Sequence, residues 1–341
     1  MSCNDFSNDR INGNMDKWIS RIIVILFACL IVLFPLTSFE GAKAGLLLWF
    51  NTVLPSLLPF MIISNLIINT GIANVLGSFF YPIFRIVFHV SPNGCYPVLI
   101  GFLSGIPVSA NAISDLVKTN NINANEGQYI LSFSNNPSPI FIITYIAISQ
   151  LHMPSISFHL LTINYISGIL SAFIYFRLIP SVKKITQEIN GKSNYNISTQ
   201  ELDKTLSQGE NSIKFDFSMF DKAIMDGFEV ITKVGGYIIL FSIPAKIISA
   251  SNFINSHIKI LSISFLEITT GISHISNNSD NIKIKIVLII AITAFGGLSA
   301  LAQTNSVINN SRLSIVTYLK NKIIHMLIAI ILAIIYTNLY L

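Results

Sequence analysis

Apolar stretches long enough to cross a membrane recur along almost the whole chain. The stretch 22–36 is almost purely aliphatic, and further stretches follow at 45–68, 73–90, 97–117, 129–150, 157–178, 223–250, 256–273, 284–307 and 323–340. A helix needs about 20 apolar residues to cross the hydrocarbon core of a bilayer. Charged residues make up only 11% of the 341 residues, against about 25% in soluble domains. The sequence therefore predicts an all-α polytopic membrane protein with about 8–10 membrane segments.

Basic residues at the ends of these stretches indicate how the chain is oriented in the membrane. Arg21 precedes the first stretch, and Lys183 and Lys184 follow the sixth, so an even number of crossings places both regions in the cytoplasm. The predicted organisation is a cytoplasmic N-terminal tail, a first membrane half, a polar cytoplasmic linker and a second membrane half, at 1–21, 22–178, 179–222 and 223–341.

The topology of the second half has two open alternatives. If all its stretches cross the membrane, Arg312, Lys320 and Lys322 lie outside, against the usual preference of basic residues for the cytoplasm. A re-entrant segment at 284–307 would return these residues to the cytoplasm. The sequence alone does not decide between the two.

The two halves share a pattern of interrupted membrane segments. In the stretches 101–111 and 294–303, small residues break an apolar run and a carboxamide follows within one or two turns. On the six-crossing count the two patterns run in opposite directions through the bilayer. Inverted repeats with broken helices at matching positions are typical of the binding site of a secondary transporter. We therefore expect two inverted repeats, the first at about 45–150, built with broken or re-entrant helices.

The first interruption is the sequence Ser104-Gly105-Ile106-Pro107. Pro107 removes a helical hydrogen-bond donor, and Gly105 permits an unwound backbone. Irregular backbone survives at membrane depth only when it is buried in protein or lines a wet cavity. The helix that resumes after Pro107 would direct free N–H groups at a solute, with Ser109 and Asn111 on the same face. A proline kink packed against neighbouring helices is the alternative.

Three further polar clusters lie beside apolar runs. The cluster Ser134–Pro139 is either a helix start at the membrane boundary or a broken-helix junction with two carboxamides in a cavity. Glu267, beside Thr269, is a costly residue at membrane depth. It is protonated, faces a cavity or pairs with a partner such as Lys246, or else both residues extend to the interface. The third cluster begins at Gly296-Gly297 and either lines a cavity or permits close helix packing.

These clusters together supply the candidate solute-binding residues. They are Ser104, Gly105, Pro107, Ser109, Asn111, Asn135, Asn136, Ser138, Glu267, Thr269, Gly296, Gly297, Ser299, Gln303 and Ser306.

Signatures of catalysis are absent from the sequence. It contains no Gly-rich phosphate loop, no HExxH and no GxSxG, and the three cysteines lack the spacing of a metal site. We therefore predict no enzymatic activity, no cofactor and no metal. The net charge of +5 is explained by orientation signals, so the expected partners are the lipid bilayer and a small-molecule solute, and no nucleic acid.

Several motifs, in this order and spacing, resemble the YlbJ-type sporulation integral membrane proteins, which carry paired nucleoside-recognition (Gate) domains. The resemblance extends from about residue 20 to the end of the chain, and its motifs are Pro55–Phe60, Gly105–Pro107, Glu126 with Asn135-Asn136, Phe265–Thr269 and Phe295–Gln303. It implies a multi-pass protein of the outer forespore membrane that moves dipicolinic acid into the developing spore, as a homo-oligomer or with spore membrane partner proteins.

The chain departs from this family pattern at the first two interruptions. Ser109 and Asn111 stand where a Gly and a basic residue are common, and Ser138 replaces a usual Gly. The missing positive charge weakens the case for a side chain that binds a dianion at the first interruption. The predicted function is a sporulation-associated transporter of a small polar or anionic solute, with dipicolinic acid expected. The alternatives are a nucleoside-type transporter and a non-transporting structural or assembly protein of the spore envelope.

Overall fold

The computed structural model describes residues 21–22, 24–70, 72–178, 217–251, 253–279, 281–309 and 311–341. All regular structure in these ranges is helical, which confirms the predicted all-α class. The predicted N-terminal tail lies outside the described residues except for Arg21. The same holds for most of the predicted linker, of which Phe217–Lys222 belongs to a long helix.

A short helix, Val24–Leu33, precedes the first half and is bent by 110° from the segment Pro35–Val53. The elements of the first half are α2 (Pro35–Leu48), η1 (Trp49–Val53), α3 (Leu54–Asn69), α4 (Ile72–Phe88), α5 (Pro92–Ser104), α6 (Val108–Lys118), α7 (Ala124–Ser134), η2 (Phe141–Gln150), η3 (Pro154–Ile156) and α8 (Ser157–Leu178). The elements of the second half are α11 (Phe217–Ala250), α12 (Ser256–Leu266), α13 (Ile268–Asn278), α14 (Ile282–Phe295), α15 (Gly297–Ile308) and α16 (Ile315–Tyr340).

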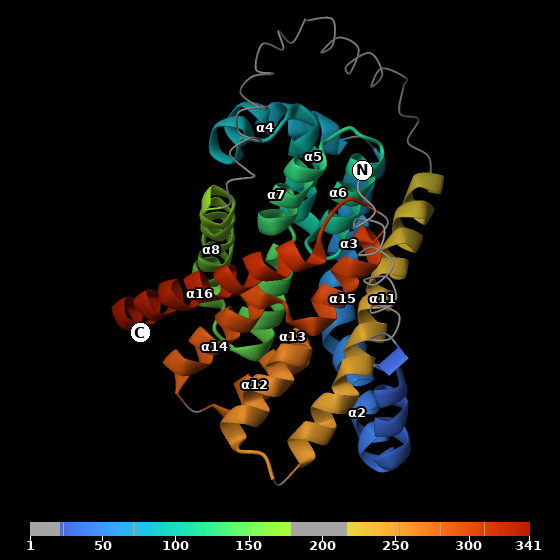
Figure 1. The fold of residues 1–341 in the computed structure, drawn as a ribbon, viewed down its shortest axis with the longest axis vertical. Helices are drawn as coiled ribbons and strands as arrows, with labels where there is room; N and C mark the ends of the chain where they lie inside the picture. The colour runs from blue at the N-terminus through green and yellow to red at the C-terminus, as the bar shows by residue number, and fades with distance from the viewer. Residues whose placement is uncertain are drawn as a thin grey trace, which may run out of the picture.

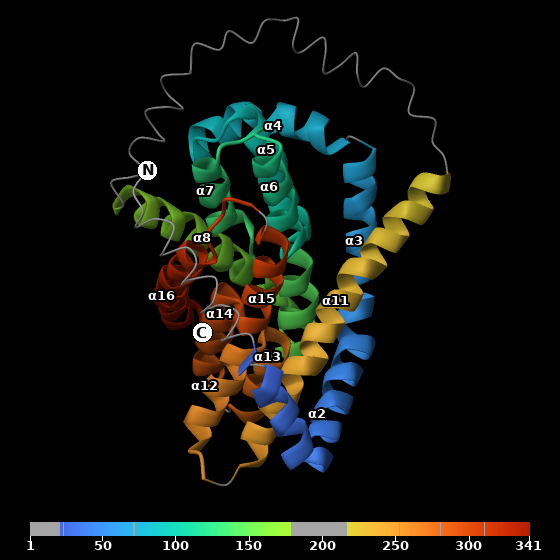
Figure 2. The same cartoon turned by 45° about the vertical axis from the view of Figure 1, so that its right-hand side comes forward.

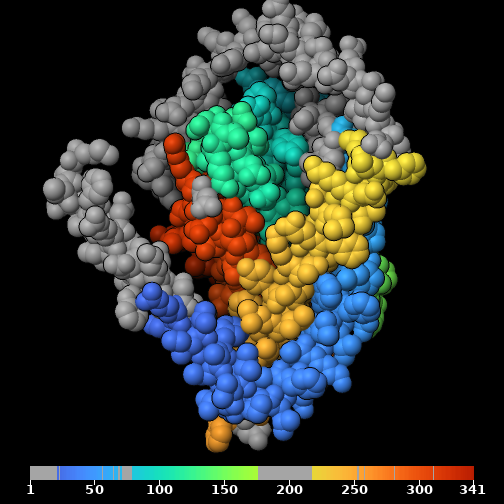
Figure 3. Space-filling view, turned by 90° about the vertical axis from the view of Figure 1, so that its right-hand side faces the viewer, coloured from blue at the N-terminus to red at the C-terminus, as the bar shows by residue number. Residues whose placement is uncertain are grey.

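A rod made of α2, η1 and α3 runs the length of the molecule beside α11 (Figures 1 and 2). Figure 3 shows the two on one face, with α11 in yellow and α2–α3 in blue. Small residues allow the close approach, since a Cβ atom on Gly45 would lie 2.7 Å from Ser242 Oγ. The indole of Trp49 packs on Gly235 and donates from Nε1 to the carbonyl oxygen of Ile231 over 3.0 Å.

Two of the apolar stretches fold back on themselves as helical hairpins. In the first, α5 and α6 run antiparallel, because Asn93 at the start of α5 donates to the carbonyl oxygen of Asn121, which follows the end of α6, over 3.1 Å. In the second, α12 and α13 pack so closely that a Cβ atom on Gly271 would lie 2.6 Å from Ser264 Cα. The first hairpin turns at 105–107 and the second at Glu267.

Two further helices are broken without reversing. α7 ends at Ser134, and its direction continues in η2 after the segment 135–140. α14 ends at Gly296, whose φ of 89° is the left-handed conformation that glycine adopts without a Cβ clash, and α15 continues beyond it. The α5–α6 hairpin and α7 enter from the upper end of the molecule in Figure 2, and the α12–α13 hairpin and α14 enter from the lower end.

Four helices in the described part of the chain are long and apolar enough to cross a membrane, or up to six if each sharply bent pair counts as one span. The predicted 8–10 membrane segments included broken and re-entrant helices as well as full spans. Two of those segments are helical hairpins, and a third contains η2, which has only ten residues. The re-entrant segment considered at 284–307 stays a prediction: Ile282–Ile308 is long and apolar enough to cross a membrane, and the chain reverses before it, at α12–α13.

Candidate solute-binding site

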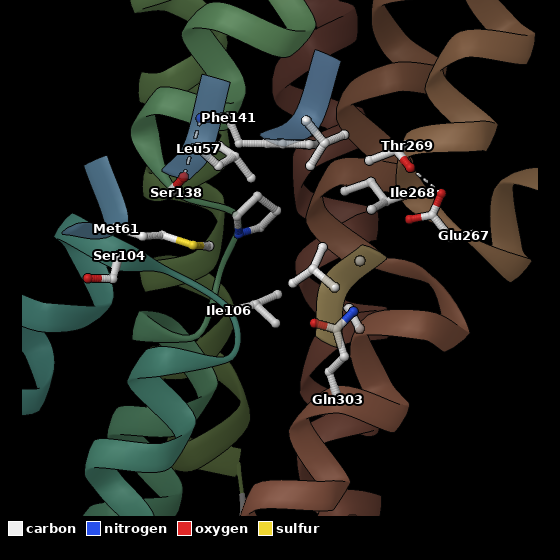
Figure 4. A pocket seen from close by; sticks show the side chains of 15 residues that line it. Leu57, Met61, Ser104, Ile106, Ser138, Phe141, Glu267, Ile268, Thr269 and Gln303 are labelled. Atoms are coloured by element: carbon white, nitrogen blue, oxygen red, sulfur yellow. Dashed lines mark hydrogen bonds between the residues drawn. The ribbon is translucent and has the colours of Figure 1, made fainter. Parts of the chain in front are cut away.

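A cavity of about 70 Å³ lies where the two hairpin tips and the two helix breaks meet. A cavity of this size holds a few water molecules. The hairpin tips contribute Ser104, Ile106, Glu267, Ile268 and Thr269; the helix breaks contribute Pro137, Ser138, Phe141, Gly296, Ala300 and Gln303; the rod and α11 contribute Val53, Leu57, Met61 and Val234. Figure 4 shows first-half side chains such as Met61 and Ser138 on one side of the space, and Ile268 and Gln303 on the other.

The tip of the first hairpin is locked against the break that follows α7. The backbone N–H of Ile106 donates to the carbonyl oxygen of Asn136 over 3.1 Å. Gly105 has a φ of 69°, and a Cβ atom there would lie 2.5 Å from the same carbonyl oxygen. Only glycine fits this position, because it satisfies both the left-handed backbone and the close approach.

At the second break, the polar side chains divide between the cavity and the protein behind it. Ser138 lines the cavity, and its hydroxyl accepts from the N–H of Phe141 over 3.3 Å, which caps the helical turn at 139–140 that leads into η2. The carboxamides of Asn135 and Asn136 are buried but do not line the cavity. The sequence alternative that placed them in a cavity is therefore wrong. Asn135 donates to Thr304 Oγ1 and to the hydroxyl of Tyr318, each over 3.0 Å. Asn136 donates to the carbonyl oxygen of Phe133 over 2.7 Å.

Glu267 caps the helix that resumes after the second hairpin tip. Its side chain is only 2% exposed, and its carboxylate accepts from the N–H of Thr270 over 2.7 Å and from the hydroxyl of Thr269. The expected pairing with Lys246 is wrong, because Lys246 pairs with Glu40 over 3.4 Å. The extension of Glu267 to the interface is equally wrong, because the start of α13 satisfies the carboxylate inside the protein.

The last cluster places one carboxamide at the cavity. Gln303 lines it and donates from Nε2 to Ser299 Oγ over 3.2 Å. The N-cap of α15 is Gly296, which has no side chain to cap the helix, so the first turn lacks the partner that Glu267 gives to α13. A Cβ atom on Gly297 would lie 3.5 Å from Glu267 Cα, which brings this break against the second hairpin tip.

The structure places the predicted site residues in three groups. Those that line the cavity are Ser104, Ser138, Glu267, Thr269, Gly296 and Gln303. Those adjacent to it or in the layer behind are Gly105, Pro107, Ser109, Asn135, Asn136, Gly297 and Ser299. Two lie outside: Asn111 is exposed and donates to Asp115, and Ser306 is exposed and donates to the carbonyl oxygen of Gln303. The face proposed to carry Ser109 and Asn111 therefore does not form, because Ser109 bonds to Ser134 on α7 over 2.9 Å.

A polar cluster between α8 and α16 was missed by the sequence analysis. It consists of Asn164, Ser167 and Ser171 on α8 and Asn321, Lys322 and His325 on α16, all at most 1% exposed. We call it the α8–α16 cluster. The signal was available as polar residues three or four positions apart inside apolar helices. Lys322 escaped notice because it lies close in sequence to Arg312 and Lys320, which are exposed.

Glu126 anchors the base of the first hairpin, outside the candidate spans. Its carboxylate accepts from the N–H of Ser91 over 2.6 Å, which ties the start of α7 to the start of α5. Burial raises the pKa of this carboxyl, and the bonds from Ser91 act in the opposite direction. A Cβ atom on Gly94 would lie 2.6 Å from Glu126 Oε1, so the carboxylate sits directly on the glycine backbone.

Comparison with known proteins gives one relative over most of the chain. The sporulation integral membrane protein YlbJ of Bacillus subtilis (strain 168) is 26% identical over 320 residues, which cover 87% of this chain and 78% of that protein. No family model matches the chain, and no solved structure does either, so a nucleoside-recognition (Gate) domain is not shown. Over most of its length the chain is thus similar to a sporulation integral membrane protein, and the helices of spanning length agree with a multi-pass integral membrane protein.

Proposed function

We propose that this protein is a sporulation-associated transporter that carries a small polar or anionic solute, dipicolinic acid, across the outer forespore membrane into the developing spore. The role in sporulation follows the name of the relative, and the solute follows the family resemblance of the motifs. Transport is supported by one observation above all. Two hairpin tips and two helix breaks, drawn from both halves of the chain, meet at a single cavity.

The order of elements supports two repeats of opposite direction. Each half contains a long helical rod, a hairpin, a broken helix and a further helix in this order: α2–α3, α5–α6, α7–η2 and α8, then α11, α12–α13, α14–α15 and α16. The first half has α4 in addition, between its rod and its hairpin. The two hairpins enter from opposite ends of the molecule. Transporters built from inverted repeats hold their solute near the bilayer midplane, where such interruptions meet.

The lining of the cavity suits a solute with an apolar face and hydrogen-bond acceptors. Phe141 and Met61 offer apolar surface, and Ser138 and Gln303 carry groups that donate hydrogen bonds. The uncapped start of α15 favours negative charge. Dipicolinate, a flat aromatic ring with two carboxylates, has this composition. Because the cavity holds only a few water molecules, loading requires the two halves to move apart, as alternating access demands.

Uptake of labelled dipicolinate by vesicles that contain only the purified protein tests the proposal. We expect uptake above that of protein-free vesicles. Gln303→Leu should reduce it at equal protein content, since the lost partner is worth about 1–3 kcal/mol, or roughly 5- to 150-fold in affinity. Ser306→Ala, on the same helix but outside the cavity, is the control and should match the wild type. No uptake by correctly inserted protein would contradict the proposal.

A nucleoside-type solute is the second candidate, and the Glu267 carboxylate at the cavity favours it. A carboxylate accepts from the hydroxyl groups of a neutral sugar but repels a dianion. Labelled uridine in the same vesicles discriminates between the two. Uptake of neither solute, combined with defective spore morphology in cells that lack the protein, would favour a structural or assembly role instead.

A further inference from the structure

Lys322 is a basic residue buried in the first third of α16, a helix long and apolar enough to cross a membrane, and it has no counter-ion in the described part of the chain. Its side chain is 0% exposed, and no carboxylate in the described part of the chain lies within ion-pair distance of it. Its ammonium donates to Asn136 Oδ1 over 2.5 Å and lies 5.4 Å from the ring centre of Tyr318. A charged side chain at the bilayer centre is costly and is usually paired or functional. A lysine can avoid this cost by releasing a proton, since the amine form is neutral.

Two hydrogen bonds connect this ammonium to the wall of the cavity. The side chain of Asn136 accepts from Lys322, and its backbone oxygen accepts from the N–H of Ile106 over 3.1 Å. Ile106 and Ser138, two residues beyond Asn136, both line the cavity. A change in the charge of Lys322 therefore acts directly on the segment that holds the first hairpin tip in place.

The neighbours of Lys322 leave polar atoms without partners. His325 Nε2 lies 2.9 Å from the carbonyl oxygen of Asn164 and 3.0 Å from Ser167 Oγ. Since a carbonyl oxygen only accepts, Nε2 is assigned the proton, and the buried Nδ1 has no partner. The side-chain nitrogens of Asn164 and Asn321 are also buried without partners. A fixed structural network satisfies its polar groups, whereas this cluster retains hydrogen-bonding capacity for a second state.

The one carboxyl group on the elements packed against α16 is that of Glu126 on α7, which accepts from Ser91 and does not lie within ion-pair distance of Lys322. α15 contains no titratable residue. On α14, Lys283 and Lys285 lie in the first turn, and Lys285 donates to the carbonyl oxygen of Ser276. The other titratable residues on these elements and on α16 itself are Tyr129, His159, Tyr165, Tyr175, Arg177, Tyr318, Lys320, His325, Tyr336 and Tyr340.

We propose that Lys322 is the proton-binding residue that couples proton movement to solute movement in this transporter. The inference rests on the proposed function. An anionic solute in the cavity stabilises the ammonium form, and the ammonium form in turn favours the anion, because opposite charges attract strongly at low dielectric. On solute binding Lys322 Nζ takes one proton from water, and on solute release it returns that proton to water. Solute and proton then travel together.

Calorimetric titration of dipicolinate into the purified full-length protein, in buffers of different ionisation enthalpy, measures the protons taken up on binding. We expect an uptake approaching about one proton per solute, and an affinity that falls as the pH rises from about 7 to about 9, where dipicolinate remains a dianion. Lys322→Met should bind without proton uptake and with an affinity independent of pH. Lys320→Met, an exposed lysine on the same helix, should behave as the wild type.

Lys322→Arg is a second variant in case Lys322→Met does not fold, because arginine keeps the positive charge but does not release its proton. It should bind dipicolinate without proton uptake. Wild-type protein that binds dipicolinate with no proton uptake at any pH would overturn the coupling while the transport function stood. Unchanged proton uptake in a folded Lys322→Met variant would overturn it equally. If wild-type protein neither binds nor exchanges dipicolinate, the proposed function fails, and the coupling fails with it.

Discussion

The backbone N–H of Ile106 donates to the carbonyl oxygen of Asn136 over 3.1 Å. One bond thus joins the tip of the first hairpin to the break of the next helix, although the two residues lie in different membrane segments. The contact depends on Gly105, the neighbour of Ile106, because any side chain there would meet the same oxygen. It makes the two interruptions one structural unit rather than two separate kinks.

Gly105→Ala should disrupt this unit. The added Cβ atom would lie 2.5 Å from the carbonyl oxygen of Asn136, on a backbone with a φ of 69°. A left-handed conformation alone costs a non-glycine residue about 1–3 kcal/mol. We expect a lower melting temperature in detergent and little solute uptake. Gly236→Ala is the matched control, because no atom lies within 4 Å of the added Cβ. Equal melting temperatures for the two variants would show that the tip does not adopt this geometry.

Two substitutions of Glu267 distinguish its role as a helix cap from the effect of its negative charge. Glu267→Ala removes the N-cap of α13 and should cost about 1 kcal/mol of stability, whereas Glu267→Gln keeps an oxygen that accepts from Thr270. The Gln variant also removes a negative charge from the cavity. It should therefore retain its stability and bind a dianion more tightly than the wild type. Melting curves and dipicolinate titrations measure both effects. Weaker dipicolinate binding by the Gln variant would count against an anionic solute.

The two hairpins start from opposite ends of the molecule, so we expect the residues at their open ends to be reached by a reagent from opposite sides of the membrane. Single cysteines at Asn121, after α6, and at Asn281, before α14, should react with a membrane-impermeant maleimide from opposite sides of sealed vesicles. The background for this experiment replaces Cys3, Cys29 and Cys95. Labelling of both positions from the same side would rule out the inverted arrangement.

Glu126 predicts a pH dependence of stability that rests on its raised pKa. A carboxyl whose pKa is higher in the folded state than in the unfolded state binds protons preferentially in the folded state, so stability falls as the pH rises through that range. From about pH 4.5 upward, the wild type should lose stability relative to Glu126→Gln, which keeps the oxygen that accepts from Ser91. Melting temperatures across this range measure the difference. A difference that does not change with pH would contradict the prediction.

The sequence predicted the fold class from apolar length alone, because hydrocarbon admits only helices and closed barrels. It also located the interruptions at Gly105 and Gly296, since glycine permits an unwound backbone and proline removes a helical hydrogen-bond donor, although Pro59 and Pro244 lie inside α3 and α11. It could not distinguish a crossing from a hairpin. The stretches 97–117 and 256–273 are apolar runs of about the length of a span, and the reversal is settled by contacts such as that between Gly271 and Ser264.

The sequence also could not predict which polar side chains face the cavity. Asn135 and Asn136 stand beside Ser138, yet only Ser138 reaches the cavity, because irregular backbone has no period from which a face can be inferred. The partner of Glu267 was misjudged because a helix start three residues on supplies donors that no charge pairing reveals. Lys322 was misjudged because positive residues near helix ends usually mark the membrane boundary.

Four helices start around the cavity, and they differ in whether a side chain caps the first turn. Ser138 caps the turn at 139–140 that leads into η2, and Glu267 caps α13, whereas α6 after Pro107 and α15 after Gly296 have no side-chain cap. The first pair is completed by side chains of the chain itself. In the function proposed above, a bound anion would accept hydrogen bonds from the free N–H groups at the start of the second pair, and would hold the two halves of the protein together while it is bound.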